Sequence, residues 1–203
     1  MLAQLEGAST ELLRQLRESY FRTMDLRLSA PIGLRLLVDK NPSYNALIPA
    51  YVRIFPEVRF LVALRDPRDV VLSGFAQSFV PLSKGAALGV TLEGMVEGYT
   101  QLMGPWLRVK PMLASPWLEV RYEEVVEDLE SVSRRTLEFL GLSWDAGVLR
   151  FHEHAAQRRI RTPTYADVTK PVFRTAMGRW RNYQKYFEPY LGKLEPFVKA
   201  FGY

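Results

Sequence analysis

The feature that most limits how this chain can fold is an apolar run that leads directly into a helix start. The run VRFLVAL, residues 58–64, is followed by RDPRD and then by a helical pattern that extends to about Phe79. Asp66 is a favourable helix N-cap and Pro67 a favourable first helical residue, so the helix begins almost where the strand ends. The stretch therefore predicts a strand and a helix joined by a very short turn.

The same order of strand, turn and helix is predicted at two other places. The run LRLLV, residues 34–38, predicts a buried strand, followed by a turn and a helix over residues 44–55. PWLEVR, residues 116–121, predicts another strand, and the acid-started helix after it ends before Gly141. Strands alternating with helices imply an α/β fold with a short parallel sheet flanked by helices, in which ligands bind at the carboxyl ends of strands.

The remaining segments fit around this sheet. Helices are expected over residues 10–27, with Thr10 as a candidate cap, and over residues 91–110. Residues 80–89 have the composition of an exposed loop near a site. The tail is expected to become helical near Gly178, with Pro189 opening a last helix that Pro196 kinks or divides.

Composition narrows the class of protein. A chain of 203 residues fits a single domain, residues 1–203, and its apolar runs are far shorter than the ~20 residues of a membrane span. With no cysteine and no secretory pattern at the N-terminus, the expected compartment is the cytoplasm. The net charge of +5 favours anionic partners, although a basic surface can also serve solubility alone.

Arg65 is predicted to lie at an anion site. It stands at the carboxyl end of a strand, beside the free N–H groups and positive dipole of a helix N-terminus. Ser73 follows Pro67 by about 9 Å along the helix, so an anion touching both would rest along the helix side. The alternative is that Arg65, Asp66, Arg68 and Asp69 form a charge-balanced surface turn and that Ser73 is an ordinary helix serine.

Other polar residues are expected at the same edge of the sheet. Lys40 and Tyr122 follow the other two predicted strands. The tail adds Gly178, which allows close backbone approach, Trp180 for stacking, and three cations, Arg174, Arg179 and Arg181. This set suits a ligand with several phosphates and an aromatic base.

Three ordered blocks carry a family resemblance. They are residues 39–75, DKNPSYNALIPAYVRIFPEVRFLVALRDPRDVVLSGF; residues 119–142, EVRYEEVVEDLESVSRRTLEFLGL; and residues 161–183, RTPTYADVTKPVFRTAMGRWRNY. Together they resemble the sulfotransferases that use 3′-phosphoadenosine 5′-phosphosulfate, particularly the branch similar to tyrosylprotein sulfotransferases and their relatives with tetratricopeptide repeats. The resemblance implies a P-loop-like three-layer α/β domain.

The resemblance also implies roles for individual residues. Arg65 and Ser73 would hold the donor's 3′-phosphate, Tyr122 would contact the adenosine end, and the tail from Arg174 to Arg181, with Gly178 and Arg179, would close over the nucleotide. Lys40 would be the catalytic residue that neutralises charge on the bridging oxygen as the sulfuryl group leaves. The implied reaction is sulfuryl transfer to a hydroxyl or amine of a small molecule, glycan or protein, with no metal.

The chain also departs from the family pattern. Only 39 residues precede Lys40, and they contain no strand followed by a Gly, Ser and Thr loop of the kind that cradles the 5′-phosphosulfate. The expectation is therefore an N-terminally truncated sulfotransferase-like domain that lacks the first strand and retains the adenosine and 3′-phosphate half of the donor site. His152 and His154, two residues apart on a predicted helix, are expected to be solvent-exposed and to bind no metal.

Two alternatives to an enzyme remain open at this point. One is a non-catalytic remnant that binds a nucleotide, or binds a partner chain through an exposed sheet edge. The other is a nucleic-acid surface on the tail, where residues 158–165 and 178–186 interleave cations with aromatic residues. The second ranks lower because the predicted cations gather around one pocket instead of spreading along a groove.

Overall fold

The computed structural model describes residues 7–28, 31–41, 44–76, 91–156 and 169–203. The chain forms two compact units: Met1–Arg59 with Leu102–Pro116, and Phe60–Gln101 with Trp117–Tyr203. In chain order the elements are α2 (Thr10–Arg27), η1 (Asn45–Leu47), α3 (Ile48–Ile54), β1 (Phe60–Leu64), α4 (Pro67–Ala76), α5 (Leu92–Val109), η3 (Lys110–Met112), β2 (Trp117–Arg121), α6 (Tyr122–Glu127), α7 (Leu129–Leu140), η4 (Ala146–Arg150), α8 (Phe151–Ala156), η5 (Arg179–Tyr183), α10 (Gln184–Phe187), η6 (Glu188–Tyr190) and α11 (Leu191–Ala200).

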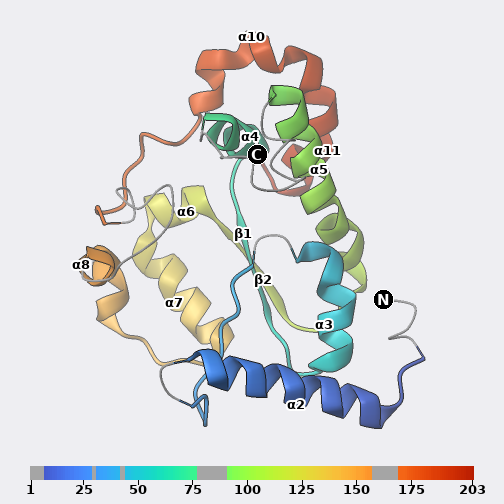
Figure 1. The fold of residues 1–203 in the computed structure, drawn as a ribbon. Coiled ribbons are helices and arrows are strands. Elements are labelled where there is room, and N and C mark those ends of the chain that lie inside the picture. The colour runs from blue at the N-terminus through green and yellow to red at the C-terminus, as the bar shows by residue number, and fades with distance from the viewer. Residues whose placement is uncertain (1–6, 29–30, 42–43, 77–90, 157–168) are drawn as a thin grey trace. The chain divides into compact units, whose positions relative to one another are not determined.

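The second unit is built on a short parallel sheet. Strands β1 and β2 pair in parallel from Phe60 opposite Trp117 to Leu64 opposite Arg121. Helices α6 and α7 pack against β2, and α4 continues from the carboxyl end of β1 (Figure 1). The predicted α/β class, with a short parallel sheet flanked by helices, is confirmed. Both carboxyl ends of the strands point to the same edge, where α4 and α6 begin.

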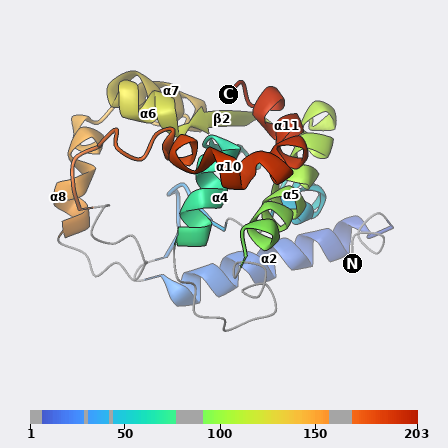
Figure 2. The same cartoon turned by 90° about the horizontal axis from the view of Figure 1, so that it is seen from above.

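The core of this unit lies between α4, α5 and the C-terminal helices. Val71 on α4, Val96 on α5, and Phe187 and Leu194 on α10 and α11 are fully buried. Trp180 meets the ring of Phe187 edge-on, with centroids 6.3 Å apart. Figure 2 shows the C-terminal segment, in red, crossing over α4, which η5 and α11 both contact. Burial of these apolar side chains therefore holds the tail against the helix that follows β1.

The first unit is held by an aromatic cluster. Tyr20 and Phe21 of α2 meet Phe55, which follows α3, edge-on at centroid distances of 4.9 and 5.7 Å. The Nδ2 of Asn45 donates a hydrogen bond to the Leu102 carbonyl at 3.0 Å, and Trp106 nearby in the chain is fully buried. Helix α2 begins at Thr10 as predicted, but the capping side chain is Ser9, whose hydroxyl accepts from the Leu12 N–H at 3.2 Å.

The prediction of a buried strand at residues 34–38 is wrong. This segment has no strand assignment, and Leu34, Leu36 and Val38 are all exposed. An apolar run becomes a strand only when a neighbour pairs with its backbone, and within the described residues the sheet consists of β1 and β2 alone. Residues 34–38 therefore have the composition of a strand but no neighbouring strand to pair with.

Several predicted boundaries also shift. The single helix expected after β2 is two helices, α6 and α7, because Asp128 leaves the helical conformation and caps α7 by accepting from the Ser131 N–H at 3.0 Å. Gly141 ends α7 in the left-handed conformation at φ 74°, as predicted. Helix α11 continues through Pro196, flanked by buried Leu194 and Phe197, so this proline does not divide it. The predicted loop at residues 80–89 lies outside the described residues.

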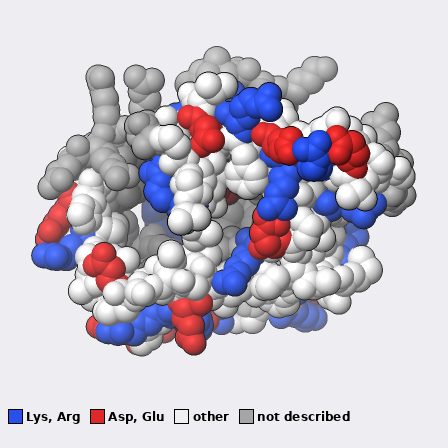
Figure 3. Space-filling model, turned by 90° about the horizontal axis from the view of Figure 1, so that it is seen from below, with Lys and Arg blue, Asp and Glu red and all other residues white. Residues whose placement is uncertain are grey.

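Basic and acidic side chains are interspersed on the face shown in Figure 3. In α2, Arg14 pairs with Glu11 at 2.7 Å and also with Glu18. Such exposed pairs contribute little to stability, but they prevent a surface of one charge sign.

In the described part of the chain, no helix has both the length and the apolar character needed to cross a membrane.

Candidate functional site

The junction of β1 and α4 places Arg65 at the end of the sheet. Asp66 caps α4 as predicted: its carboxylate accepts from the Arg68 N–H at 2.9 Å and pairs with the Arg68 guanidinium at 2.7 Å. Pro67 is the first residue of the helix. Arg65 is thus the last residue before the helix cap, and its side chain starts from the carboxyl edge of the strand.

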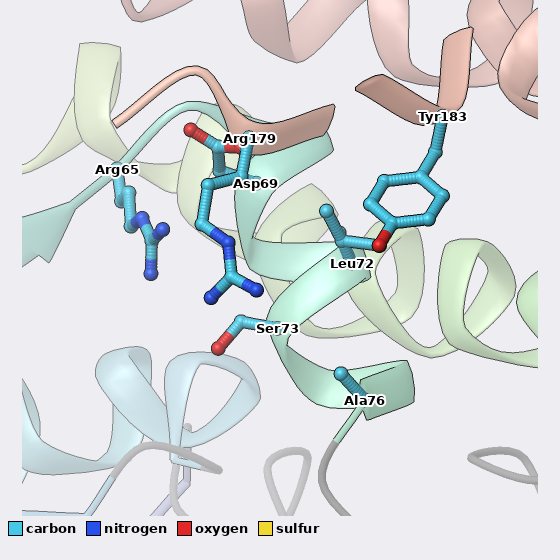
Figure 4. Close-up of a pocket in the computed structure, with 7 residues that line it drawn as sticks. All are labelled: Arg65, Asp69, Leu72, Ser73, Ala76, Arg179 and Tyr183. Carbon is cyan, nitrogen blue, oxygen red and sulfur yellow. The ribbon is translucent and has the colours of Figure 1, made fainter. Parts of the chain in front are cut away.

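A small pocket lies beside α4. Its volume is about 50 Å³, and Arg65, Asp69, Leu72, Ser73, Ala76, Arg179 and Tyr183 line it. Figure 4 shows the guanidinium groups of Arg65 and Arg179 and the hydroxyl of Ser73 on the same side of α4, facing one hollow. Two permanently charged groups and one hydroxyl are side chains that can donate hydrogen bonds to an anion, so we call this hollow the anion pocket. The volume suits one tetrahedral anionic group, since pockets for whole nucleotide-sized ligands are several times larger.

Arg65 is held in place from two directions. Its Nη2 donates to the carbonyl of Ala176 in the tail, and its guanidinium carbon lies 4.9 Å from the centre of the Tyr122 ring. Its Nε is buried and has no hydrogen-bond partner among the described residues. The guanidinium is therefore oriented before any ligand arrives, and ordering it on binding costs less side-chain entropy.

Asp69 also lines the pocket, although its local sequence pattern predicts only a charged residue of the turn. Its side chain is buried, with the residue 1% exposed, and its carboxylate accepts the N–H of Gly178 at 2.5 Å and of Trp180 at 2.9 Å. Asp66 is buried as well, so RDPRD is not the surface turn of the alternative prediction, although Asp66 and Arg68 do balance each other's charge. The sequence does show Asp69 as a second acid three residues after the Asp66 cap. Its hydrogen-bond partners, however, lie more than 100 residues further along the chain, so no local pattern points to them.

A second, apolar pocket begins at Tyr122. Its volume is about 390 Å³. Its lining is Tyr122, Val125, Leu129, Phe151, Lys170, Pro171, Val172 and Phe173. The Tyr122 hydroxyl donates to the Phe173 carbonyl at 3.4 Å, which ties β2 and α6 to the tail. Tyr122 therefore lines the apolar pocket while its ring contacts Arg65, which lines the anion pocket.

Glu123 links the ends of the two strands. One of its oxygens accepts from the Asp66 N–H at 3.1 Å and the other from the Tyr203 hydroxyl at 2.7 Å. Burial, and then this hydrogen bond, raise the pKa of the Tyr203 phenol above its usual range. Glu123 lies in the first turn of α6, as predicted for a helix-start acid, and it also holds α6 against the start of α4.

The structure brings together part of the predicted set. Arg65, Ser73 and Arg179 line one pocket, with Tyr122 in contact with Arg65. Gly178 has φ +66° and hydrogen-bonds to Asp69. Arg174 and Arg181 do not line the pocket, and the Arg181 guanidinium lies 5.4 Å from the Trp180 ring instead.

Lys40 and the two histidines are not among the residues that line the pocket. Lys40 is exposed in the first unit, next to Asp39, whose carboxylate accepts from the Tyr20 hydroxyl at 2.9 Å. His154 is exposed as predicted, but His152 is half-buried with its Nδ1 enclosed. Within the described ranges, no three His, Cys, Asp or Glu side chains are grouped as metal ligands.

Comparison of the sequence with known protein families establishes the family of this chain. The model of the sulfotransferase family matches residues 4–146, which include β1, α4, β2 and α6. The chain belongs to the sulfotransferase family, as its motifs predicted. The match ends before the tail, so Arg179 reaches the pocket from outside the matched residues.

Two relatives have longer chains than this one. An uncharacterized protein of Aquifex aeolicus (strain VF5) is 26% identical over 164 residues, which are 78% of this chain and 21% of the relative. Protein-tyrosine sulfotransferase 1 of Danio rerio is 23% identical over 188 residues, 86% of this chain and 49% of the relative. The chain thus spans about half, or less, of the length of these relatives.

Proposed function

We propose that this chain binds 3′-phosphoadenosine 5′-phosphosulfate as a sulfuryl donor. The 3′-phosphate would lie between Arg65, Ser73 and Arg179, and the adenosine end would lie beside Tyr122. The observation that carries the proposal is the convergence of two guanidinium groups and a hydroxyl, from three separate segments, at the carboxyl end of β1. A phosphate monoester has the charge and the acceptor oxygens for these donors.

The arrangement of the two pockets supports the same ligand. Arg65 of the anion pocket contacts the ring of Tyr122, which lines the apolar pocket. An adenosine 3′-phosphate carries a phosphate and an aromatic base on one ribose, so it needs an anion site and an apolar site as neighbours. The apolar pocket, at about 390 Å³, is within the range that small-molecule sites occupy.

The reaction we propose is transfer of the sulfuryl group to a hydroxyl or amine. The bond between sulfur and the bridging phosphate oxygen breaks, a bond from the acceptor to sulfur forms, the acceptor releases its proton, and adenosine 3′,5′-bisphosphate remains. Lys40 is proposed to stabilise the charge that develops on the bridging oxygen. The name of the zebrafish relative makes a tyrosine-containing peptide the first acceptor to assay.

Because the chain spans about half of that relative, donor binding and sulfuryl transfer by this chain alone are separate proposals. A binding module without catalysis would share the donor site and differ only in the absence of transfer. Incubation with donor and a tyrosine-containing peptide distinguishes the two: release of bisphosphate that depends on the peptide supports an enzyme, and donor binding without release supports the module.

Calorimetric titration with adenosine 3′,5′-bisphosphate and with adenosine 5′-monophosphate tests the proposed site. The wild-type chain is expected to prefer the bisphosphate, because only that nucleotide carries a 3′-phosphate. Arg179→Ala removes a charged donor and should weaken bisphosphate binding about 10- to 100-fold, while Ser73→Ala, which removes a neutral donor, should weaken it less.

A matched control is Arg134→Ala, which removes another exposed arginine, from α7 and outside the pocket lining. Its bisphosphate affinity should stay within about twofold of the wild type, since long-range charge effects are screened. Equal weakening by Arg134→Ala and Arg179→Ala would mean that general charge, and not this pocket, attracts the nucleotide.

A further inference from the structure

Asp69 is a buried carboxylate whose hydrogen-bond partners lie on the tail. Its two oxygens accept the N–H groups of Gly178 and Trp180, at 2.5 and 2.9 Å, and the residue is 1% exposed. Burying a carboxylate is costly unless it is well hydrogen-bonded. Both oxygens are engaged by the backbone on either side of one residue, and that residue is Arg179.

The two hydrogen bonds hold Arg179 from both sides. With the N–H groups of residues 178 and 180 anchored to the same carboxylate, the backbone of Arg179 has little freedom to move relative to α4. Ser73 follows Asp69 by four residues, so both side chains lie on one face of α4. The same helix face therefore carries the hydroxyl of the anion pocket and the anchor for its second guanidinium (Figure 4).

We infer that Asp69 is a positioning residue for 3′-phosphate recognition, acting through Arg179; this inference rests on the proposed function. The negative charge of Asp69, which lines the pocket, would by itself weaken the binding of an anion. A carboxylate at this position is therefore compatible with anion binding only if it also favours binding in another way. The compensation is geometric: the carboxylate fixes the tail so that Arg179 faces Arg65 and Ser73. If Asp69 acts mainly through its charge, an uncharged residue in its place should strengthen bisphosphate binding. If Asp69 positions Arg179, the same substitution should weaken that binding.

The experiment is a double-mutant cycle on the whole chain, with calorimetry against adenosine 3′,5′-bisphosphate and adenosine 5′-monophosphate. Asp69→Asn keeps the size and removes the charge; because the two N–H groups bind different oxygens of Asp69, one of them would face the amide NH2, which cannot accept a hydrogen bond. It is expected to weaken bisphosphate binding about tenfold and to leave 5′-monophosphate binding within about twofold. In the Arg179→Ala background, Asp69→Asn should cause no further loss, because coupled residues are non-additive.

Each result supports or overturns the inference. Tighter bisphosphate binding by Asp69→Asn, or an equal loss in both backgrounds, would overturn it while leaving the proposed function intact. No preference for the bisphosphate in the wild-type chain would reject the proposed function and this inference with it. Asp128→Asn, at the exposed cap of α7, is the control and should leave the affinity for both nucleotides unchanged.

Hydrogen exchange of the unaltered chain decides the matter if Asp69→Asn does not fold. The amides of Gly178 and Trp180 are expected to exchange slowly, and more slowly still with the bisphosphate bound, because the ligand favours the anchored tail. The 5′-monophosphate should give no such added protection. Fast exchange at both amides, or equal protection by the two nucleotides, would contradict the positioning role.

Discussion

At the scale of single residues, Gly178 determines the course of the tail as it approaches α4. Its backbone is left-handed, with φ +66°, directly before η5. A Cβ placed there would clash with Nη1 of Arg181. The residue thus combines a conformation that disfavours any side chain with a position where the Arg181 guanidinium folds back over the backbone.

Gly178→Ala should therefore destabilise the chain and loosen the nucleotide site. The left-handed conformation costs an alanine about 1 kcal/mol, and the Arg181 side chain must also move. We expect a lower urea midpoint and weaker bisphosphate binding. Gly98→Ala is the control: Gly98 lies inside α5 with nothing within 4 Å of an added Cβ, so it should gain about 0.5–1 kcal/mol of stability. Equal effects of the two substitutions would contradict this account.

At the scale of elements, α4 is the helix on which the site depends. Its start is set by Asp66, its buried face carries Val71, and Asp69 and Ser73 face the tail and the pocket. The Asp66 carboxylate also binds Nε of Arg68 at 2.8 Å, and that guanidinium lies 4.1 Å from the centre of the Trp180 ring. The cap of α4 and the packing of the tail are therefore joined through Arg68.

Asp66→Ala should cost more stability than the loss of an ordinary helix cap. The cap itself contributes about 1 kcal/mol, and the substitution also leaves the largely buried Arg68 guanidinium without its carboxylate, for an expected total of about 2–4 kcal/mol. Asp128→Ala removes an exposed cap from α7 and should cost less. Urea unfolding of both variants measures the difference, and equal losses would show that the buried ion pair adds nothing.

The local part of this element could be predicted from sequence, and its long-range part could not. The end of the strand, the Asp66 cap, Pro67 at the helix start and the position of Arg65 between strand and helix follow from neighbours in RDPRD. The bonds from Asp69 to Gly178 and Trp180 join segments about 110 residues apart, and an acid in a first helical turn also suits the helix dipole. The local sequence therefore does not show whether Asp69 binds the distant tail or only stabilises the start of its own helix.

At the scale of the whole molecule, the two units differ in how well their sequence patterns predicted them. In the second unit, β1 and β2 satisfy each other's backbone groups, and the pattern of apolar runs predicted both strands. In the first unit, residues 34–38 have a similar composition but no strand partner among the described residues, and Leu34, Leu36 and Val38 are exposed. Pairing is a property of two segments, so composition of one segment cannot establish it.

Three tyrosines that are buried or half-buried allow one pH titration to report on both units. Burial raises the pKa of Tyr20 in the first unit, and of Tyr99 and Tyr203 in the second, above the usual range. Hydrogen bonds to Asp39 and Glu123 raise the pKa of Tyr20 and Tyr203 further. The folded chain therefore holds these phenols neutral at a pH where the unfolded chain, with pKa values of about 10, ionises them.

The sign of the pH dependence follows from this difference. Below about pH 10 both states keep the phenolic protons and the contribution to stability is constant; above it the unfolded state releases protons first, so stability falls as the pH rises.

Near-ultraviolet absorbance should show late ionisation in the folded chain and ordinary ionisation in urea. Tyr203→Phe should remove one late-ionising group and make the alkaline loss of stability less steep. Ionisation of all ten tyrosines at the ordinary pH in the folded chain would contradict the burial of Tyr99 and the hydrogen bonds of Tyr20 and Tyr203.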